Sequence, residues 1–225
     1  KDTVNNRNSL EEGKVFLPSS ITSSSLWNTM PSEDLAPINP DTPKPINYTM
    51  LWSISALCFI GYFGQGSIGD WSAIYLSDDL NASALECTFG YVGFELFVAI
   101  GTFISDKFVD AFGRKLLLEI SGILSAVGLF LAVMALSSST HTGSMALAIT
   151  GFSISGLGLS VVPPCVVSLA GSGISGLTPD TAIAYVSSIG YVGIMVGPPF
   201  LGGISQVQGL RYSFAVDAGI MLLIT

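Results

Sequence analysis

Glu95 is the residue in this sequence with the clearest capacity for chemistry, because it is an acid inside a long apolar segment. It precedes Asp106, which closes that segment, by eleven residues, or about 16 Å along a helix at roughly 1.5 Å per residue. That depth is near the middle of a hydrocarbon core about 30 Å thick, where an ionised carboxylate is unfavourable. We therefore expect Glu95 to be protonated, paired or facing water. A proton- or substrate-coupling site and a structural acid bonded to a neighbouring helix both stay open.

Four further polar residues are candidates for binding a solute. Gln65 lies in "GQGSIG", where the glycines could break the helix and free backbone groups for a ligand. Tyr62 is about one turn earlier and could line the same cavity. Ser153 and Ser155 could offer hydroxyls to a polar substrate, although serines in membrane helices commonly bond to the backbone. Plain helix packing is the alternative for these residues.

Two further groups of charged and aromatic residues are expected near one membrane surface. Asp70 and Trp71 should end the first apolar helix there. Trp71 would then be an interfacial anchor, and Asp70 the cap of a short continuation, "WSAIYL"; an outer gate is the alternative. Asp217 follows Arg211 by six residues, about 9 Å along a helix, and we expect it to pair locally near the rim.

Composition places all these residues in a membrane protein. The chain has 225 residues, 49% hydrophobic and 11% charged, against about 25% charged in soluble domains. Six apolar segments follow a polar stretch, and each of the first five is long enough for a spanning helix of about 20 residues. Only helices or closed barrels satisfy the backbone in lipid, and these segments are too long for barrel strands. The sequence predicts an all-α membrane protein: an irregular tail or linker over 1–45 and a six-helix bundle over 46–225, with its last helix truncated.

Two proline pairs fall within these segments. Proline lacks a backbone N–H and clashes with the preceding turn of a helix. We expect Pro163-Pro164 to kink or locally unwind the fourth helix, and Pro198-Pro199 the fifth.

The basic residues predict the orientation of the bundle. If the six helices alternate in direction, seven of the eight Lys and Arg residues fall on one side: Lys1, Arg7, Lys14, Lys44, Lys107, Arg114 and Lys115. Basic residues favour the cytoplasmic side. We expect the tail and residues 106–115 to be cytoplasmic, while the kind of membrane (bacterial inner, plasma or organellar) stays open.

The connection "SDKFVDAFGRK" at 105–115 concentrates charge between apolar segments. Gly113 permits a tight reversal, and Asp106 or Asp110 could pair with Arg114 or accept backbone donors. A solvated turn is the plain alternative. The turn "DAFGRK" resembles the signature loop of the major facilitator superfamily, D-[RK]-x-G-[RK]-[RK]. The segments "GQGSIGDWSAIYL" and "GYVGIMVGPPFLGGISQVQGLR" resemble the seventh and eleventh helices of its sugar-permease-like branch.

This resemblance covers about residues 46–225 and implies that they form helices seven to twelve of a facilitator. Residues 1–45 would be the central linker, and the first six helices would be absent. The resemblance further implies a secondary transporter with alternating access, and a gating loop in which Arg114 pairs with an acid such as Asp106. The gating residues would be Asp106, Asp110, Gly113, Arg114 and Lys115.

Three positions depart from the family's pattern. Gln65 stands where the branch tends to have a carboxylate. Thr102 and Ala111 stand where a basic residue is usual. The missing carboxylate at position 65 argues against proton coupling at that position. The missing basic residues at positions 102 and 111 would weaken the gating role of the loop.

These patterns favour a secondary active transporter of a small polar solute, such as a sugar or metabolite. Whether this transport is coupled to protons through Glu95 stays open. The alternative is a facilitator-like structural subunit of a larger membrane complex without transport activity. The sequence has no nucleotide-binding loop, nucleophile elbow or HExxH motif, and no basic patch for nucleic acid. We expect no enzymatic activity, no cofactor and no metal site. The expected partners are the lipid bilayer, the missing N-terminal half or a partner membrane protein, and a small polar solute.

Overall fold

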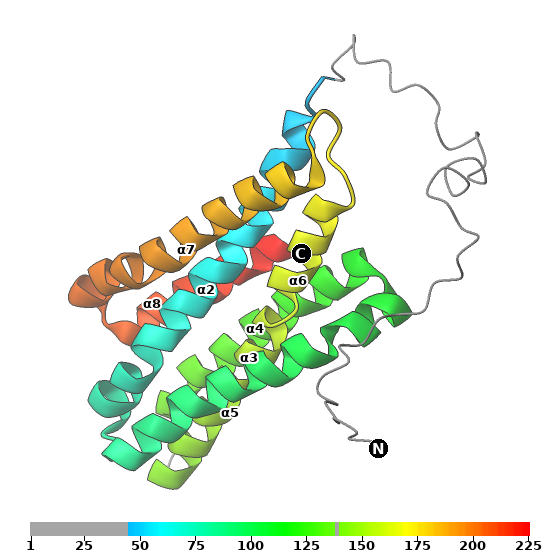
Figure 1. Ribbon diagram of the computed structural model, residues 1–225. Coiled ribbons are helices and arrows are strands. Elements are labelled where there is room, and N and C mark those ends of the chain that lie inside the picture. Colours follow the sequence, from blue (N-terminus) through cyan, green and yellow to red (C-terminus); the bar gives the residue numbers. More distant parts are fainter. Residues whose placement is uncertain (1–44, 138–139) are drawn as a thin grey trace, which may run out of the picture. The chain divides into compact units, whose positions relative to one another are not determined.

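The structure, a computed structural model, describes residues 45–137 and 140–225. In these ranges all regular structure is helical (Figure 1). The main helices are α2 (Tyr48–Leu80), α3 (Ala84–Phe112), α4 (Arg114–Met134), α5 (His141–Leu159), α6 (Val162–Gly171), α7 (Pro179–Gln208) and α8 (Leu210–Met221), with short 3-10 turns at Ala135–Ser137 and Leu222–Ile224. The predicted all-α class is confirmed. Apart from residue 45, the predicted tail at 1–45 lies outside the described residues.

Five helical segments in the described ranges are long and apolar enough to cross a membrane: Tyr48–Leu80, Ala84–Phe112, Arg114–Met134, His141–Gly171 and Pro179–Gln208. The fourth of them is the pair α5 and α6 taken together. The sixth predicted segment corresponds to α8, which has 12 residues, fewer than a complete span needs. The predicted membrane bundle is confirmed, with its last helix short.

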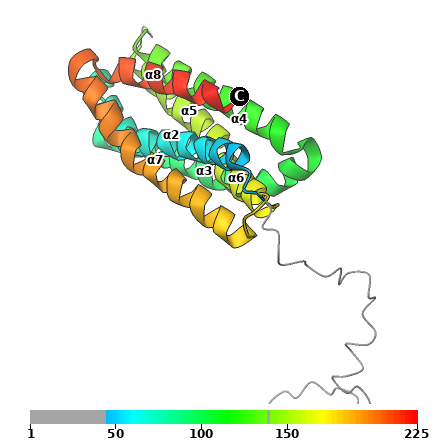
Figure 2. The same ribbon diagram turned by 90° about the horizontal axis from the view of Figure 1, so that it is seen from above.

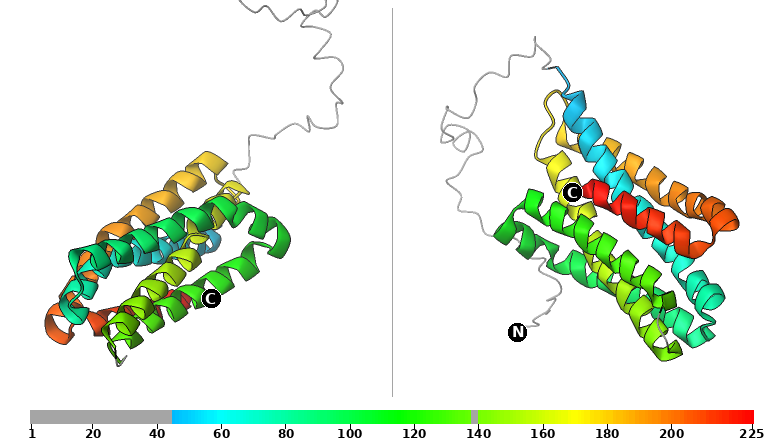
Figure 3. Two further views of the ribbon diagram at one scale, coloured as in Figure 1. Left: turned by 90° about the horizontal axis from the view of Figure 1, so that it is seen from below. Right: turned by 180° about the vertical axis from the view of Figure 1, so that it is seen from behind.

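Helix α2 runs through the middle of the bundle and contacts α3, α5, α6, α7 and α8. Helix α7 lies along one side of α2, and α3, α4 and α5 lie on the other (Figures 1 and 2). Helix α8 packs on α2, α4 and α7 and is in front when the bundle is seen from behind (Figure 3, right). Because α3 and α7 lie at opposite margins, α2, α5 and α6 occupy the space between them.

An aromatic cluster joins four helices in the core. The ring of Tyr75 (α2) lies 6.0 Å from that of Phe152 (α5) and 5.3 Å from that of Phe214 (α8), and the two phenylalanine rings are 5.4 Å apart. The buried Tyr75 hydroxyl donates a hydrogen bond to the carbonyl of Ala132 in α4, at 2.9 Å. The tyrosine thus contributes apolar packing and has its one polar group satisfied.

Local sequence signals explain several helix ends. Helix α2 stops where Asn81 adopts a left-handed conformation, with φ 54°, which asparagine tolerates better than most residues. Helix α3 starts with a capping box, in which the Ser83 N–H donates to the Glu86 carboxylate at 2.8 Å and the Glu86 N–H donates to the Ser83 hydroxyl. Gly113 has φ 80° and separates α3 from α4, a backbone conformation that favours glycine.

The prediction that the first helix breaks around Gln65 and ends at Asp70 and Trp71 is wrong. Helix α2 is continuous from Tyr48 to Leu80. A glycine inside a helix costs only about 1 kcal/mol, which helix packing can offset. Here Gly64 packs against Met221 of α8, and Gly66 against Ile194 of α7.

The two proline pairs behave differently. Helix α5 ends at Leu159 and α6 begins at Val162, so the predicted interruption at Pro163-Pro164 is confirmed. Helix α7 stays helical through Pro198-Pro199. There, the carbonyl of Ile194, which would bond to the N–H of residue 198 in a proline-free helix, lies against Gly66. The close approach of α2 covers this carbonyl without unwinding α7.

Candidate functional site

Glu95 of α3 faces α2 at Gly69. A Cβ built at Gly69 would lie 3.7 Å from Oε1 of Glu95, so the carboxylate lies beside the backbone of α2 at this glycine. Gln65 is four residues earlier on the same side of α2. The structure therefore brings Glu95 and Gln65, two of the predicted site residues, to within about one helical turn of each other.

The Glu95 side chain is exposed on the described bundle. Within the described ranges it has no hydrogen-bond partner and no ion pair. Glu95 lies in the middle part of its helix, whereas the described Lys and Arg residues lie at or near helix ends: Lys107, Arg114, Lys115 and Arg211. A carboxyl group placed in this way is open to a solute, water or a proton from the exposed face of the bundle.

Next to this site the fourth span is interrupted, which leaves two carbonyl groups without their helical donors. In a continuous helix the N–H of residue 163 would bond to the carbonyl of Leu159, and that of residue 164 to the carbonyl of Ser160. Pro163 and Pro164 have no N–H to give. Unsatisfied carbonyls are costly in a membrane interior, so other donors must reach them.

Side chains from two neighbouring helices supply these donors. The Gln65 amide of α2 donates to the carbonyl of Leu159 at 3.3 Å. The Thr102 hydroxyl of α3 lies 3.2 Å from the carbonyl of Ser160 and 2.9 Å from that of Val98, so its one hydrogen is shared between two acceptors. Sequence reasoning proposed Gln65 as a candidate cavity residue and as a departure from the family pattern, and it noted Thr102 only as a departure. The signal that could have identified their role is the need of each proline-freed carbonyl for a donor.

The other predicted cavity residues point in different directions. Tyr62 packs against Tyr191 of α7, with ring centroids 5.5 Å apart. The Ser153 hydroxyl donates to Ile149 in its own helix at 2.8 Å. Its oxygen would lie 3.0 Å from a Cβ built at Gly93 of α3, so Ser153 faces α3 two residues from Glu95.

Ser155 lies on the side of α5 that faces α4. Its hydroxyl is fully buried and lies within hydrogen-bond distance of the carbonyls of Ser125, at 3.0 Å, and Gly151, at 3.1 Å. The structure thus places Ser155 in a helix contact and does not bring it together with Glu95.

Trp71 joins α2 to α7. Its indole N–H donates to the carbonyl of Pro198 at 2.9 Å, and its ring lies against Gly202. The side chain is half-buried in this contact, whereas its neighbour Asp70 is exposed. Trp71 therefore makes a specific helix–helix contact beyond the interfacial anchoring that its position in the sequence suggests.

In the charged connection the only described ion pair is Lys115 with Glu119, at 3.8 Å and one turn apart on the surface of α4. The expected pair between Arg114 and Asp106 is not formed among the described residues. Helix α6, the segment that follows the interruption, contacts both α3 and α4.

Asp217 differs from its prediction. It is fully buried in α8, and neither carboxylate oxygen has a hydrogen-bond partner among the described residues, so the expected local pairing is absent there. The buried residues Leu210, Phe214, Asp217 and Met221 recur at helical spacing, and this pattern could have placed Asp217 on the buried face. The backbone of Arg211 instead bonds to the carboxylate of Asp79, at the end of α2.

Asp217→Ala is expected to raise the free energy of unfolding by about 1–3 kcal/mol, because it removes a buried polar group that lacks a partner. Thermal unfolding of the purified whole protein would measure this change. Ser213→Ala is the matched control in the same helix, because the Ser213 hydroxyl lies 3.2 Å from the carbonyl of Leu201 and its loss should lower stability by about 1 kcal/mol. Destabilisation by Asp217→Ala would mean that Asp217 has a partner in the whole protein.

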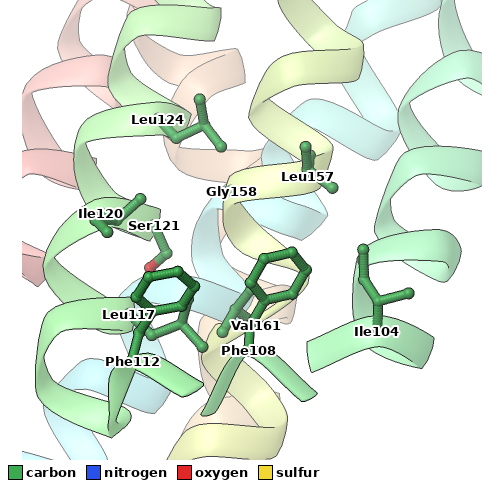
Figure 4. A pocket seen from close by; sticks show the side chains of 11 residues that line it. Ile104, Phe108, Phe112, Leu117, Ile120, Ser121, Leu124, Leu157, Gly158 and Val161 are labelled. Atoms are coloured by element: carbon green, nitrogen blue, oxygen red, sulfur yellow. The ribbon is translucent and has the colours of Figure 1, made fainter. Parts of the chain in front are cut away.

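A pocket of about 330 Å³ lies between α3, α4 and α5, beside the α3–α4 turn (Figure 4). Its walls are almost entirely apolar, with Phe108 and Phe112 from α3 and Leu117 and Ile120 from α4. The hydroxyl of Ser121 in its wall already donates to Leu118, at 2.8 Å. None of the predicted solute-binding residues lines this pocket, and its walls offer few groups to orient a polar solute. In the described part of the chain, no cluster of His, Cys, Asp and Glu is suited to a metal ion.

Comparison with known proteins is consistent with this architecture. A family model described as Major Facilitator Superfamily matches residues 51–225. An uncharacterised MFS-type transporter of Yersinia pestis is 32% identical over 171 residues, covering 76% of this chain and 42% of that protein. Membrane protein MosC of Rhizobium meliloti is 31% identical over 168 residues, covering 74% of this chain and 39% of its own length. The chain thus spans about two fifths of the length of these relatives.

Proposed function

Because this chain belongs to the major facilitator superfamily, we propose that it forms the C-terminal half of a secondary transporter for a small polar solute such as a sugar or metabolite. The observation that carries this proposal is the carboxylate of Glu95, exposed beside Gly69 and one turn from Gln65. An acid at this depth in a membrane helix is costly unless it faces water, a partner or a solute. A polar path through the membrane gives it such surroundings.

The exposed margins of the bundle fit a half that meets another half. The most apolar windows of α3 and α7 are only 17% and 22% buried, against 61% for the α5–α6 segment. Large side chains on these two helices are exposed, among them Leu96 and Phe97 on α3, and Tyr191 and Met195 on α7. We propose that α3 and α7 flank the solute path, that six further helices close it, and that lipid surrounds the whole.

In this mechanism the solute binds near Glu95 from one side of the membrane, and the two halves then rock to open the site to the other side. Glu95 would carry a proton when the solute is bound and release it on the side of lower proton concentration. The connection at 106–115 would face the cytoplasm. Gln65, whose amide is held by the carbonyl of Leu159, would support the wall of the site and would not itself carry a proton.

Solute uptake by vesicles that contain the whole purified protein would test this function. We expect saturable uptake of at least one member of a panel of labelled sugars and small metabolites, and accumulation driven by an inward proton gradient. Empty vesicles and vesicles with heat-unfolded protein are the controls. No uptake by folded protein, together with stable co-purification in a large membrane complex, would instead favour a structural subunit.

A further inference from the structure

We propose that the apolar pocket between α3, α4 and α5 binds one acyl chain of a membrane phospholipid, whose anionic headgroup lies beside Arg114 and Lys107. Glu95 faces α2 at Gly69 and does not line this pocket. The lipid would therefore sit outside the proposed solute path. Its binding does not depend on whether the protein carries a solute.

Close packing on α5 leaves the pocket open between α3 and α4. A Cβ built at Gly158 of α5 would lie 2.8 Å from the carbonyl oxygen of Ser121 in α4. A Cβ at Gly101 of α3 would collide with the side chain of Ser160, which ends α5. Helices α3 and α4 are thus both held against α5 at glycines. Between these contacts their side chains leave a space of about 330 Å³ (Figure 4).

The walls of the pocket suit a hydrocarbon chain. Ile104 of α3, Leu124 of α4 and Leu157 of α5 line it, and it offers almost no polar surface (Figure 4). Phe108 and Phe112 line the end next to the turn, with their rings stacked 6.1 Å apart. An apolar cavity of about 150 Å³ can hold a benzene molecule, so this pocket has room for several methylene groups. An occupant would restore the dispersion contacts that an empty space denies to its lining.

The surroundings of the pocket supply such a chain. Helices α3 and α4 are both long and apolar enough to span a membrane. Ile104 and Ile120 line the pocket and are also exposed at its rim, and Ile123 and Val127 continue the exposed apolar surface along α4. In a membrane such a surface meets lipid tails. A tail can therefore enter from the side, whereas a water-soluble ligand would find few polar groups to bind.

Two basic residues lie near the end of the pocket at the turn. Arg114 precedes Leu117 by three residues, and Lys107 follows Ile104 by three, a spacing that makes side chains neighbours on a helix surface. Leu117 and Ile104 both line the pocket. Neither Arg114 nor Lys107 forms an ion pair within the described ranges. Basic side chains at the end of a membrane span attract anionic headgroups.

The acidic residues of the connection lie away from the pocket. Asp106 and Asp110 are each two residues from Phe108, a spacing that places them on another side of α3. Glu119 pairs with Lys115 at 3.8 Å on the surface of α4. The charges nearest the pocket are therefore positive. This arrangement favours a phospholipid with a net negative headgroup over a zwitterionic one.

Photolabelling tests the acyl-chain site. The probe is phosphatidylglycerol with a diazirine in one acyl chain, in phosphatidylcholine vesicles that contain the whole purified protein, and adducts are located by peptide mass spectrometry. We expect adducts to concentrate in 101–124 and 157–161. Leu124→Trp, which fills the pocket, should lower this labelling about tenfold, the equivalent of about 1.4 kcal/mol. Ile123→Trp places the same side chain on the exposed face of α4 outside the pocket and should leave the labelling unchanged.

A second comparison tests the headgroup. Arg114→Gln should lower labelling by the phosphatidylglycerol probe about fivefold, the equivalent of about 1 kcal/mol for one basic residue near the membrane surface. Labelling by the matching phosphatidylcholine probe should not change. Lys115→Gln is the control, because Lys115 is already paired with Glu119, and it should leave labelling by both probes unchanged.

Two outcomes would overturn the proposal. Adducts spread evenly over the exposed faces of α3, α4 and α7, unaffected by Leu124→Trp, would mean that only ordinary surrounding lipid is labelled. Equal labelling of the pocket by the two probes would exclude selection of an anionic lipid. If Leu124→Trp does not fold, Ile104→Trp fills the pocket from α3, with the exposed Phe103→Trp as its control.

Discussion

Glu95→Gln is expected to abolish solute accumulation driven by a proton gradient while leaving solute exchange intact. A gradient of one pH unit supplies about 1.4 kcal/mol per proton, enough for about tenfold accumulation if one proton moves with each solute. Glutamine has almost the same shape as glutamic acid but cannot release a proton. The variant should therefore equilibrate the solute without concentrating it, as measured by uptake into vesicles with and without an inward proton gradient.

A matched control is available on the next helix. Glu119 is a carboxylate on the surface of α4, paired with Lys115 at 3.8 Å, so Glu119→Gln removes an acid without touching the proposed site. Accumulation should persist in that variant. Unchanged accumulation in Glu95→Gln would place the coupling proton elsewhere, and loss of both exchange and accumulation would assign Glu95 to solute binding alone.

The membrane bundle was predictable because hydrophobic length is a local property of the sequence. A run of about 20 apolar residues specifies a spanning helix with no information about its neighbours. The ends were less predictable. The second apolar segment was expected to stop near residue 105, yet α3 continues to Phe112 through Asp106, Lys107 and Asp110. Charged side chains mark where a helix leaves the lipid, but they do not end the helix. Helix α3 ends at Gly113, whose φ is positive.

The candidate site was only partly predictable, because its geometry depends on contacts between distant residues. The depth of Glu95 follows from counting along one helix. The partners of Gln65 and Thr102 are 94 and 58 residues away in sequence, and no local pattern specifies them. Asp217 shows the same limit. Its distance from Arg211 along the helix predicts a position near the membrane surface, but the packing of α8 against its neighbours buries the side chain completely.

Gly151→Ala is expected to lower the free energy of unfolding by about 2–3 kcal/mol, in the upper range for an overpacked contact. At this position α4 and α5 approach through their backbones. A Cβ at Gly151 would lie 2.6 Å from the carbonyl oxygen of Gly128 and 2.7 Å from the backbone nitrogen of Ala132, and a Cβ at Gly128 would lie 2.5 Å from the carbonyl oxygen of Gly151. Backbone atoms cannot rotate away as a side chain can, so a methyl group must push the helices apart.

The size of this effect can be isolated with a second glycine. Gly203 of α7 is exposed, and a Cβ built there meets nothing within 4 Å among the described residues. Because Gly→Ala in a helix gains about 1 kcal/mol of helix propensity at either site, Gly203→Ala should be neutral or stabilising, and the difference between the two variants measures the clash. Thermal unfolding and size-exclusion chromatography of the whole protein would provide both values. Ser155 and Ser125 lie across the same contact, so separation of α4 from α5 would also break their hydrogen bond. Equal stability of the two variants would mean that this contact does not hold α4 and α5 together.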